Sequence, residues 1–113
     1  WEFPQGSKEH EPDATPEQVA AEELFEETGL TAASTVKLGK LFQAYGYANQ
    51  SVHVFLATEL TQGETAPEAE EAGLVSRSFS REECDELMSD GSISDLATVA
   101  AFQLFDRYMK VHG

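Results

Sequence analysis

The sequence predicts an α/β fold, and three stretches of the chain carry that prediction. Residues 16–28 show a helical pattern between clear start and stop signals. Residues 51–60 alternate apolar and polar side chains, as a β-strand does. A helical period returns over residues 96–108. Because these elements follow one another in a chain of 113 residues, we expect one α/β domain of modest size.

The first helix is predicted to begin at Pro16 and to end at Thr28. Thr15 can cap its N-terminus, and Gln18 completes a T-x-x-Q capping box. Proline suits the first helical position. Gly29 stands where a left-handed C-cap is expected. The side chains that we expect to pack inward are Ala20, Ala21 and Leu24.

Strands are predicted after this helix. Residues 31–34 are expected to be a short connection, and residues 36–41 a strand with a bulge at Gly39. A loop or hairpin turn over residues 42–50 leads to the strand at 51–60. Phe55 is apolar on the second face of that strand, so we expect it to be central and covered on both sides. Residues 74–79 are predicted to form a last short strand.

Two helices are predicted to complete the chain. Ser80 and Glu83 form a second capping box, which opens a short helix that Asp90 and Gly91 end. We expect Ser92 or Ser94 to cap the last helix. The side chains predicted to face the core from that helix are Leu96, Val99, Ala100, Gln103 or Leu104, and Tyr108.

The composition is strongly acidic and excludes several partners. The chain carries 21 Asp and Glu against 7 Lys and Arg, so its formal net charge is −14. DNA, RNA and anionic membranes are bound through clustered Lys and Arg, and we expect none of them as a partner. The single cysteine, Cys84, excludes an internal disulfide and indicates a reducing cytoplasm. No stretch has the pattern of a membrane span or a signal peptide.

The first helix carries four carboxylates within six residues, at Glu22, Glu23, Glu26 and Glu27. A helix turns about 100° per residue, so Glu23 shares one face with Glu26 and Glu27. Like charges at this spacing destabilise a helix, and a hard cation such as Mg²⁺ or Mn²⁺ would convert the repulsion into coordination. The alternative is a solvated acidic face, because glutamate is a good helix former.

The residues around these carboxylates resemble a known motif. The string ELFEETGL at 23–30, together with WEFPQG at 1–6, is similar to the end and the lead-in of the Nudix box, G-x5-E-x7-R-E-U-x-E-E-x-G-U with U aliphatic. The resemblance implies a Nudix α/β/α sandwich with a mixed sheet. It implies a single Nudix domain over residues 1–113, with its N-terminal strands absent from this chain.

The same resemblance implies an activity and its metal site. Nudix hydrolases use a divalent ion, Mg²⁺ or Mn²⁺, to cleave the pyrophosphate of a nucleoside diphosphate linked to another moiety. Glu23 and Glu27 are then the leading metal-ligand candidates, and Glu26 is a third. A backbone carbonyl of Gln5 or Gly6 is a further candidate ligand.

Two further resemblances bear on the substrate. DGSISDLAT at 90–98 and VFLA at 54–57 are similar to segments of ADP-ribose pyrophosphatase-like Nudix proteins, which implies ADP-ribose or another nucleotide sugar. Where such enzymes often carry a proline, this chain has Tyr45 and Tyr47, which resemble the base-stacking aromatics of dinucleoside polyphosphate hydrolases. Gln5, Tyr45 and Tyr47 are the candidate substrate-binding residues. Simple packing at a turn is the alternative for the two tyrosines.

A late glutamate-rich loop is the candidate source of the catalytic base. Several Nudix enzymes carry a base or an extra metal ligand on such a loop, and Glu68, Glu70 and Glu71 occupy the corresponding region. Glu70 is the favoured base, and a solvated acidic loop is the alternative. ADP-ribose-type relatives commonly form dimers, so a homodimer is also implied.

Two positions depart from the motif. Glu22 stands where the box has its arginine, and Ala14 where it has its earlier glutamate. In the family that arginine pairs with a carboxylate and holds the metal-binding glutamates, whereas Glu22 adds negative charge. Lys8 is a candidate for the compensating charge. These departures motivate an alternative function, a catalytically weak Nudix domain that binds a nucleotide or a protein.

Overall fold

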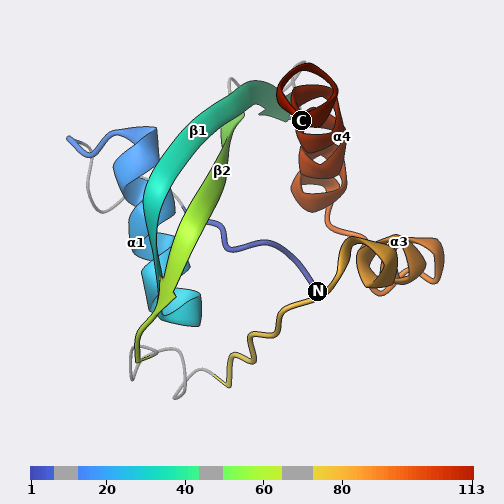
Figure 1. Cartoon of the computed structure of the whole chain (residues 1–113), viewed down its shortest axis with the longest axis horizontal. Helices are drawn as coiled ribbons and strands as arrows, with labels where there is room; N and C mark the ends of the chain where they lie inside the picture. The colour runs from blue at the N-terminus through green and yellow to red at the C-terminus, as the bar shows by residue number, and fades with distance from the viewer. Residues whose placement is uncertain (7–12, 44–49, 65–72) are drawn as a thin grey trace. The chain divides into compact units, whose positions relative to one another are not determined.

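The computed structural model describes residues 1–6, 13–43, 50–64 and 73–113. Its elements, in chain order, are helix α1 (Pro16–Thr28), strands β1 (Leu30–Gln43) and β2 (Gln50–Gln62), and helices α3 (Arg81–Ser89) and α4 (Leu96–His112) (Figure 1). The two strands are antiparallel neighbours and form a two-stranded sheet in the described part of the chain. The predicted α/β class is confirmed.

Helix α1 has the bounds and the caps that the sequence predicts. The Thr15 hydroxyl accepts the Gln18 N–H at 3.1 Å, and the Gln18 side chain accepts the Thr15 N–H at 2.9 Å. Gly29 has φ 75°, in the left-handed region that favours glycine, and its N–H donates to the Phe25 carbonyl at 2.8 Å. The buried side chain of the helix is Val19, which the predicted inward face omitted.

The chain forms two compact units, each assembled from separated stretches of sequence. The terminal unit comprises residues 1–3, 38–54 and 78–113. The α1 unit comprises residues 4–37 and 55–77. Both strands of the sheet therefore continue from one unit into the other.

The α1 unit is closed by contacts between the end of α1 and the end of β2. Gly63 N–H donates to the Gly29 carbonyl at 2.8 Å, and the Gln62 side-chain amide donates to the Thr28 carbonyl at 2.8 Å. Strand β1 begins at Leu30, directly after the helix C-cap, so the predicted connection at residues 31–34 is wrong. These residues pair in the sheet instead.

The core of the terminal unit lies on α4 and the segment before it. Its buried side chains are Ile93, Ala97, Thr98, Ala101 and Phe102. The predicted core face of α4 is wrong in part, because Leu96 is 71% exposed and Val99 is 42% exposed. The N-cap is also different from the predicted serines. Asp95 caps the helix, and its carboxylate accepts the Thr98 N–H at 2.9 Å.

Strand β1 changes the face that it buries at Gly39. The even-numbered residues from Leu30 to Leu38 are partly buried, and from Gly39 to Gln43 the odd-numbered residues are. A Cβ added at Gly39 would lie 3.2 Å from Leu104 Cδ1, so this glycine makes room for Leu104. The last predicted strand, at residues 74–79, is wrong because the segment has no strand structure, and Val75 is 76% exposed.

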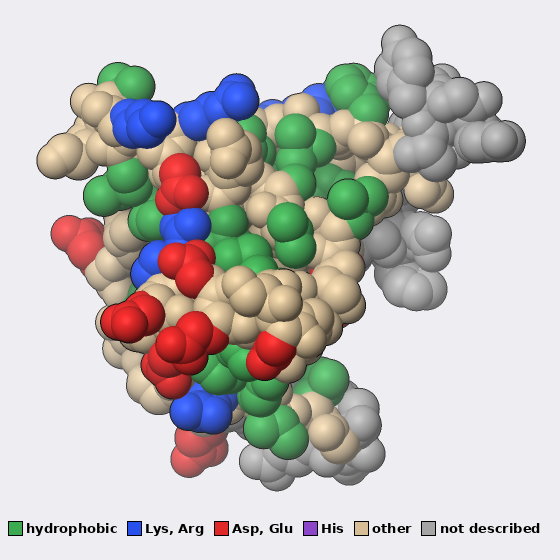
Figure 2. Space-filling view, turned by 90° about the vertical axis from the view of Figure 1, so that its right-hand side faces the viewer, with side chains coloured by type: hydrophobic (Ala, Val, Ile, Leu, Met, Phe, Trp, Pro, Cys, Tyr) green, Lys and Arg blue, Asp and Glu red, His purple; other side chains and the backbone are tan. Residues whose placement is uncertain are grey.

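Acidic side chains gather on the face that Figure 2 shows, and α3 contributes many of them. The exposed carboxylates of this helix are Glu82, Glu83, Asp85 and Glu86. Arg81 is held by two of the surrounding acids. Its guanidinium donates twice to Asp106, at 2.6 and 3.0 Å, and once to Asp85, at 2.9 Å. In the described ranges no helix is long and apolar enough to cross a membrane.

Candidate metal-binding site

Two carboxylates of α1 lie against the segment that leads into the helix. Glu23 and Glu27 are partly buried, whereas Glu22 and Glu26 are exposed. Because residues 23 and 27 are one helical turn apart, their side chains leave the same face. The leading segment contacts both of them, through Gln5 and Gly6.

The contact at Glu27 is a hydrogen bond to the backbone. The Gln5 N–H donates to Glu27 Oε2 at 3.2 Å, across 22 positions of sequence. Hydrogen bonds to a charged acceptor hold it more firmly than neutral ones do. The bond therefore orients this carboxylate relative to the leading segment.

The contact at Glu23 explains why residue 6 is a glycine. A Cβ added at Gly6 would overlap the Cγ, Cδ and Oε1 atoms of Glu23. The Glu23 carboxylate therefore occupies the space that any other side chain at position 6 would need. Glycine allows this close approach of backbone and carboxylate.

The electrostatic setting of Glu23 favours a cation. Burial raises the pKa of the Glu23 carboxyl above its ordinary value, and the neighbouring charge of Glu26 raises it further. Both effects oppose the ionised form. A bound cation acts in the opposite direction, because an adjacent positive charge stabilises a carboxylate.

The donor set suits a hard ion that keeps part of its hydration. Among the described residues, no group of three or more acidic, histidine or cysteine side chains is arranged to hold a metal ion. Glu23 and Glu27 are both oxygen donors, and Mg²⁺ is commonly bound by one or two carboxylates together with water and substrate phosphates. The carboxylate chemistry thus fits Mg²⁺ or Mn²⁺. Glu26 contributes its charge next to Glu23 and is the third predicted ligand.

The predicted catalytic and base-stacking residues lie outside the described residues. Glu68, Glu70 and Glu71 fall in the range 65–72, and Tyr45 and Tyr47 fall in the range 44–49. Their roles stay predictions. The structure brings together Gln5, Gly6, Glu23 and Glu27 from the predicted set.

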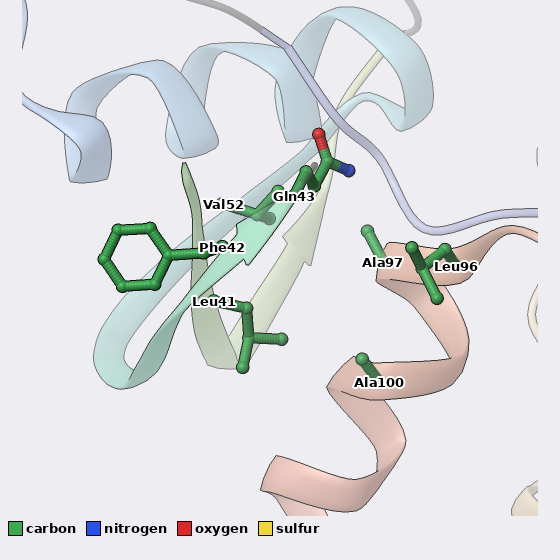
Figure 3. Close-up of a pocket in the computed structure, with 7 residues that line it drawn as sticks. All are labelled: Leu41, Phe42, Gln43, Val52, Leu96, Ala97 and Ala100. Carbon is green, nitrogen blue, oxygen red and sulfur yellow. The ribbon is translucent and has the colours of Figure 1, made fainter. Parts of the chain in front are cut away.

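An apolar cavity of about 210 Å³ lies within the terminal unit (Figure 3). Gln43 contributes a polar side chain to the lining of this cavity. The other residues that line it are Leu41, Phe42, Val52, Leu96, Ala97 and Ala100. This lining contains no charged group and no predicted site residue. A site for a pyrophosphate needs cations or convergent donors, so the cavity does not suit that group.

Sequence reasoning missed one polar pair, Asp95 and Thr98. The Thr98 hydroxyl donates to Asp95 Oδ2 at 2.8 Å, and it accepts the Phe3 N–H at 3.0 Å. A local signal was present, because aspartate followed three residues later by threonine is compatible with an N-cap. The contact to Phe3 spans 95 positions, and no local pattern reports it.

We expect Gly6→Ala to weaken Mn²⁺ binding by about 10- to 100-fold, the loss typical when a supporting contact of a metal ligand is disturbed. The added methyl group would displace the Glu23 carboxylate. Electron paramagnetic resonance of Mn²⁺ during a titration measures the change. The control is Glu2→Ala, which truncates an exposed side chain of the same segment. Equal affinities for Gly6→Ala and the parent would contradict a role for Glu23 as a ligand.

The structure combines an α/β fold with an acidic helix, α1, whose Glu23 lies against Gly6. Comparison with known families shows which class of protein has this combination. The profile of the NUDIX domain matches residues 1–98. The chain belongs to the NUDIX domain family, as the resemblance predicted.

Individual relatives agree with this membership. The chain is 36% identical over 89 residues to the ADP-ribose pyrophosphatase of Bacillus subtilis (strain 168), an alignment that covers 78% of this chain and 48% of the relative. It is also similar to a solved structure described as an ADP compounds hydrolase, with a TM-score of 0.74 and 23% identity. That match covers 91% of this chain and 55% of the other. The chain therefore spans about half the length of these relatives, and the structural match shows a shared fold.

Proposed function

We propose that the protein is a metal-dependent hydrolase that cleaves the pyrophosphate bond of a nucleoside diphosphate linked to another moiety. The observation that carries the proposal is the arrangement of Glu23 and Glu27 against Gly6 and Gln5. It places two partly buried carboxylates beside the segment of residues 1–6 in a member of the NUDIX domain family. We also propose that the ion is magnesium. The same proposal includes a homodimer and a cytoplasmic location.

The reaction needs the negative charge of the substrate to be neutralised. A divalent ion, when bound, neutralises phosphate oxygens and lowers the pKa of a coordinated water. Glu23 and Glu27 would hold that ion, with Glu26 or a carbonyl of Gln5 or Gly6 as further donors. The Gln5 N–H orients Glu27, and the glycine at position 6 gives Glu23 room.

The proton of the attacking water needs a base. We assign this role to Glu70, with Glu68 and Glu71 as alternatives. The assignment rests on the resemblance to Nudix enzymes that use a glutamate of a late loop. A carboxylate in this role would accept the proton as the oxygen–phosphorus bond forms.

ADP-ribose is the substrate that the relatives favour. The relative from Bacillus subtilis is named as an ADP-ribose pyrophosphatase, and the segments at 54–57 and 90–98 resemble that type of enzyme. Cleavage of ADP-ribose within its pyrophosphate yields AMP and ribose 5-phosphate. Another nucleotide sugar with the same pyrophosphate would serve the same chemistry.

We expect the protein to release AMP from ADP-ribose in the presence of Mg²⁺, and we expect EDTA to abolish the release. The physical reason is that the carboxylates of α1 repel the substrate phosphates unless a cation lies between them. Chromatography of nucleotide products measures the reaction, and restoring Mg²⁺ in excess controls for damage by the chelator. Failure to release product from ADP-ribose and from a panel of nucleotide sugars would reject the enzyme proposal.

A second candidate is a module that binds a nucleotide or a protein without efficient turnover. It is favoured by Glu22 at the arginine position of the motif and by Ala14 at the position of its earlier glutamate. Calorimetry separates the two candidates. Binding of ADP-ribose that persists without AMP release would favour the module.

A further inference from the structure

The last turn of α1 carries two of the acidic side chains of the candidate metal site. Glu26 and Glu27 lie in this turn, which contains no basic residue. The backbone carbonyls at the C-terminus of a helix carry partial negative charge, so carboxylates there are disfavoured. Without a cation, the turn therefore depends on hydrogen-bond donors from another element to keep its helical form.

The end of strand β2, which lies beside the last turn of α1 in Figure 1, supplies such donors. The Gln62 side-chain amide donates to the Thr28 carbonyl at 2.8 Å and to the Gly63 carbonyl at 2.9 Å. The Gly63 N–H donates to the Gly29 carbonyl at 2.8 Å. We call these three bonds the β2 clamp. All of its residues belong to the α1 unit, so the clamp is a feature of that unit alone.

The β2 clamp brings two glycines into close contact. A Cβ added at Gly29 would lie 2.7 Å from the Gly63 carbonyl oxygen and 2.9 Å from Gln62 Nε2. A Cβ added at Gly63 would lie 3.1 Å from the Gly29 carbonyl oxygen. The backbone at the end of β2 therefore rests directly on the C-cap of α1, with no side chain between them.

The backbone of β2 is strained just before the clamp. Glu59, three residues before Gln62, has φ 56°, in the left-handed region where glutamate is uncommon. The other positive φ angles among the described residues belong to glycines. Strain of this kind persists where surrounding contacts hold the chain in place. The contacts of Gln62 and Gly63 hold the strand beyond this point.

We propose that Gln62 is a positioning residue for Glu27, and through Glu27 for the candidate metal site. Gln62 holds the carbonyl of Thr28, whose Cα follows that of Glu27 at about 3.8 Å. Helix ends fray, and fraying of this turn would move Glu27 away from the Gln5 N–H that orients its carboxylate. The inference rests on the proposed function for its metal site.

The neutral charge of the Gln62 donor suits this role. Lysine and arginine are the side chains that commonly stabilise the last carbonyls of a helix. A fixed positive charge at this place would also attract the carboxylates of Glu26 and Glu27 and would compete with a metal ion for them. The amide of Gln62 donates hydrogen bonds without a formal charge, so it stabilises the turn and leaves the negative charge of the carboxylates uncompensated.

The test is Gln62→Met, which keeps the length of an exposed side chain and removes its donors. Nuclear magnetic resonance follows the exchange rate of the Gly63 amide, which reports on the clamp, and the shift of the Gln5 amide proton, which reports on Glu27. We expect exchange at Gly63 to become about fivefold faster, as the loss of two modest hydrogen bonds allows. The Gln5 shift should change. Mn²⁺ affinity, measured by electron paramagnetic resonance, should fall by at least about threefold, because only the ordered turn presents Glu27.

Thermodynamic linkage gives a second readout, which needs no variant. If the ordered turn favours the metal, the metal must favour the ordered turn to the same extent. Saturating Mg²⁺ should therefore slow exchange at the Gly63 amide of the parent by at least about threefold. A clamp with a purely structural role would not respond to the ion. Unchanged exchange at Gly63 in a parent protein that binds Mg²⁺ would overturn the inference.

The matched control is Gln18→Met, the same chemical change at the opposite end of α1. The Gln18 side chain accepts the Thr15 N–H in the capping box, so this variant weakens the start of the helix. It should leave the Gly63 amide, the Gln5 amide and Mn²⁺ affinity close to the parent. If Gln18→Met weakened Mn²⁺ binding as much as Gln62→Met, general loss of the helix would explain both results and the inference would fail.

The proposed function can fail separately. A parent protein that binds no Mn²⁺ and hydrolyses no nucleotide sugar would reject the metal site. The Gln5 amide shift then decides whether Gln62 positions Glu27, because the bond between Gln5 and Glu27 does not need the metal. A changed shift in Gln62→Met would support the positioning of Glu27, and an unchanged shift would overturn it.

Discussion

Replacing Glu27 by glutamine is expected to lower kcat/KM for ADP-ribose by at least about 100-fold, which corresponds to about 2.7 kcal/mol of transition-state stabilisation. Glutamine keeps an oxygen that can accept the Gln5 N–H, so the local geometry persists. The negative charge that would hold a divalent ion is removed. Initial rates of AMP release at saturating Mg²⁺ measure the effect.

In the absence of metal, the same substitution is not expected to destabilise the protein. Removing one of several like charges on α1 should leave the free energy of unfolding unchanged or raise it by a few tenths of a kcal/mol. Glu17→Gln is the matched control, because it removes one charge from the first turn of the same helix. A Glu27→Gln variant as active as Glu17→Gln would disprove the assignment of the ligand.

Replacing Phe102 by alanine is expected to lower the free energy of unfolding by about 3–5 kcal/mol, as large-to-small changes of buried aromatics do. The Phe102 side chain is 8% exposed. Its ring contacts one aromatic ring and one guanidinium group from segments distant in sequence. Phe3 contacts it with centroids 4.9 Å apart, and the Arg81 guanidinium lies 4.8 Å from its centroid. The truncation would remove both contacts and leave a cavity.

Denaturant titration measures this loss, and thermal unfolding should show a fall of at least about 10 °C. Phe42→Ala is the control, because the Phe42 side chain is 55% exposed and its removal is expected to change stability by less than about 1 kcal/mol. Similar losses for the two variants would mean that Phe102 is not part of the core.

Local signals were enough to predict the helices that begin with capping boxes. Thr15 with Gln18, and Ser80 with Glu83, form both reciprocal bonds, and α1 and α3 begin where these boxes predict. Such caps depend on residues within one turn, so the sequence displays the whole interaction. The left-handed C-cap at Gly29 was likewise predictable from a local signal, the glycine at the end of the helix.

Features that depend on distant partners were not predictable in the same way. The buried face of α4 is set by what packs on it, and an apolar residue such as Leu96 remains 71% exposed. The change of face along β1 at Gly39 follows the approach of Leu104, a residue 65 positions later in the sequence (104 − 39). Periodicity shows that a face exists, but it does not show which neighbour covers it.

The candidate site shows both kinds of prediction. The common face of Glu23 and Glu27 follows from helical geometry, and their nearness to residues 5 and 6 was expected from the resemblance to the Nudix box. The bond between Thr98 and Phe3 was not expected. It joins residues 95 positions apart, and no local pattern in the sequence reports it.

The division of the chain into two interleaved units has a consequence for synthesis on the ribosome. The α1 unit is complete in sequence once Arg77 has emerged, whereas the terminal unit needs residues 1–3 together with residues 78–113. Trp1 and Phe3 must therefore wait for the last helix before their partners exist, and closing so long a loop slows folding. During that interval the rings of Trp1 and Phe3 lack the rings of Phe79 and Phe102, which they contact in the folded structure.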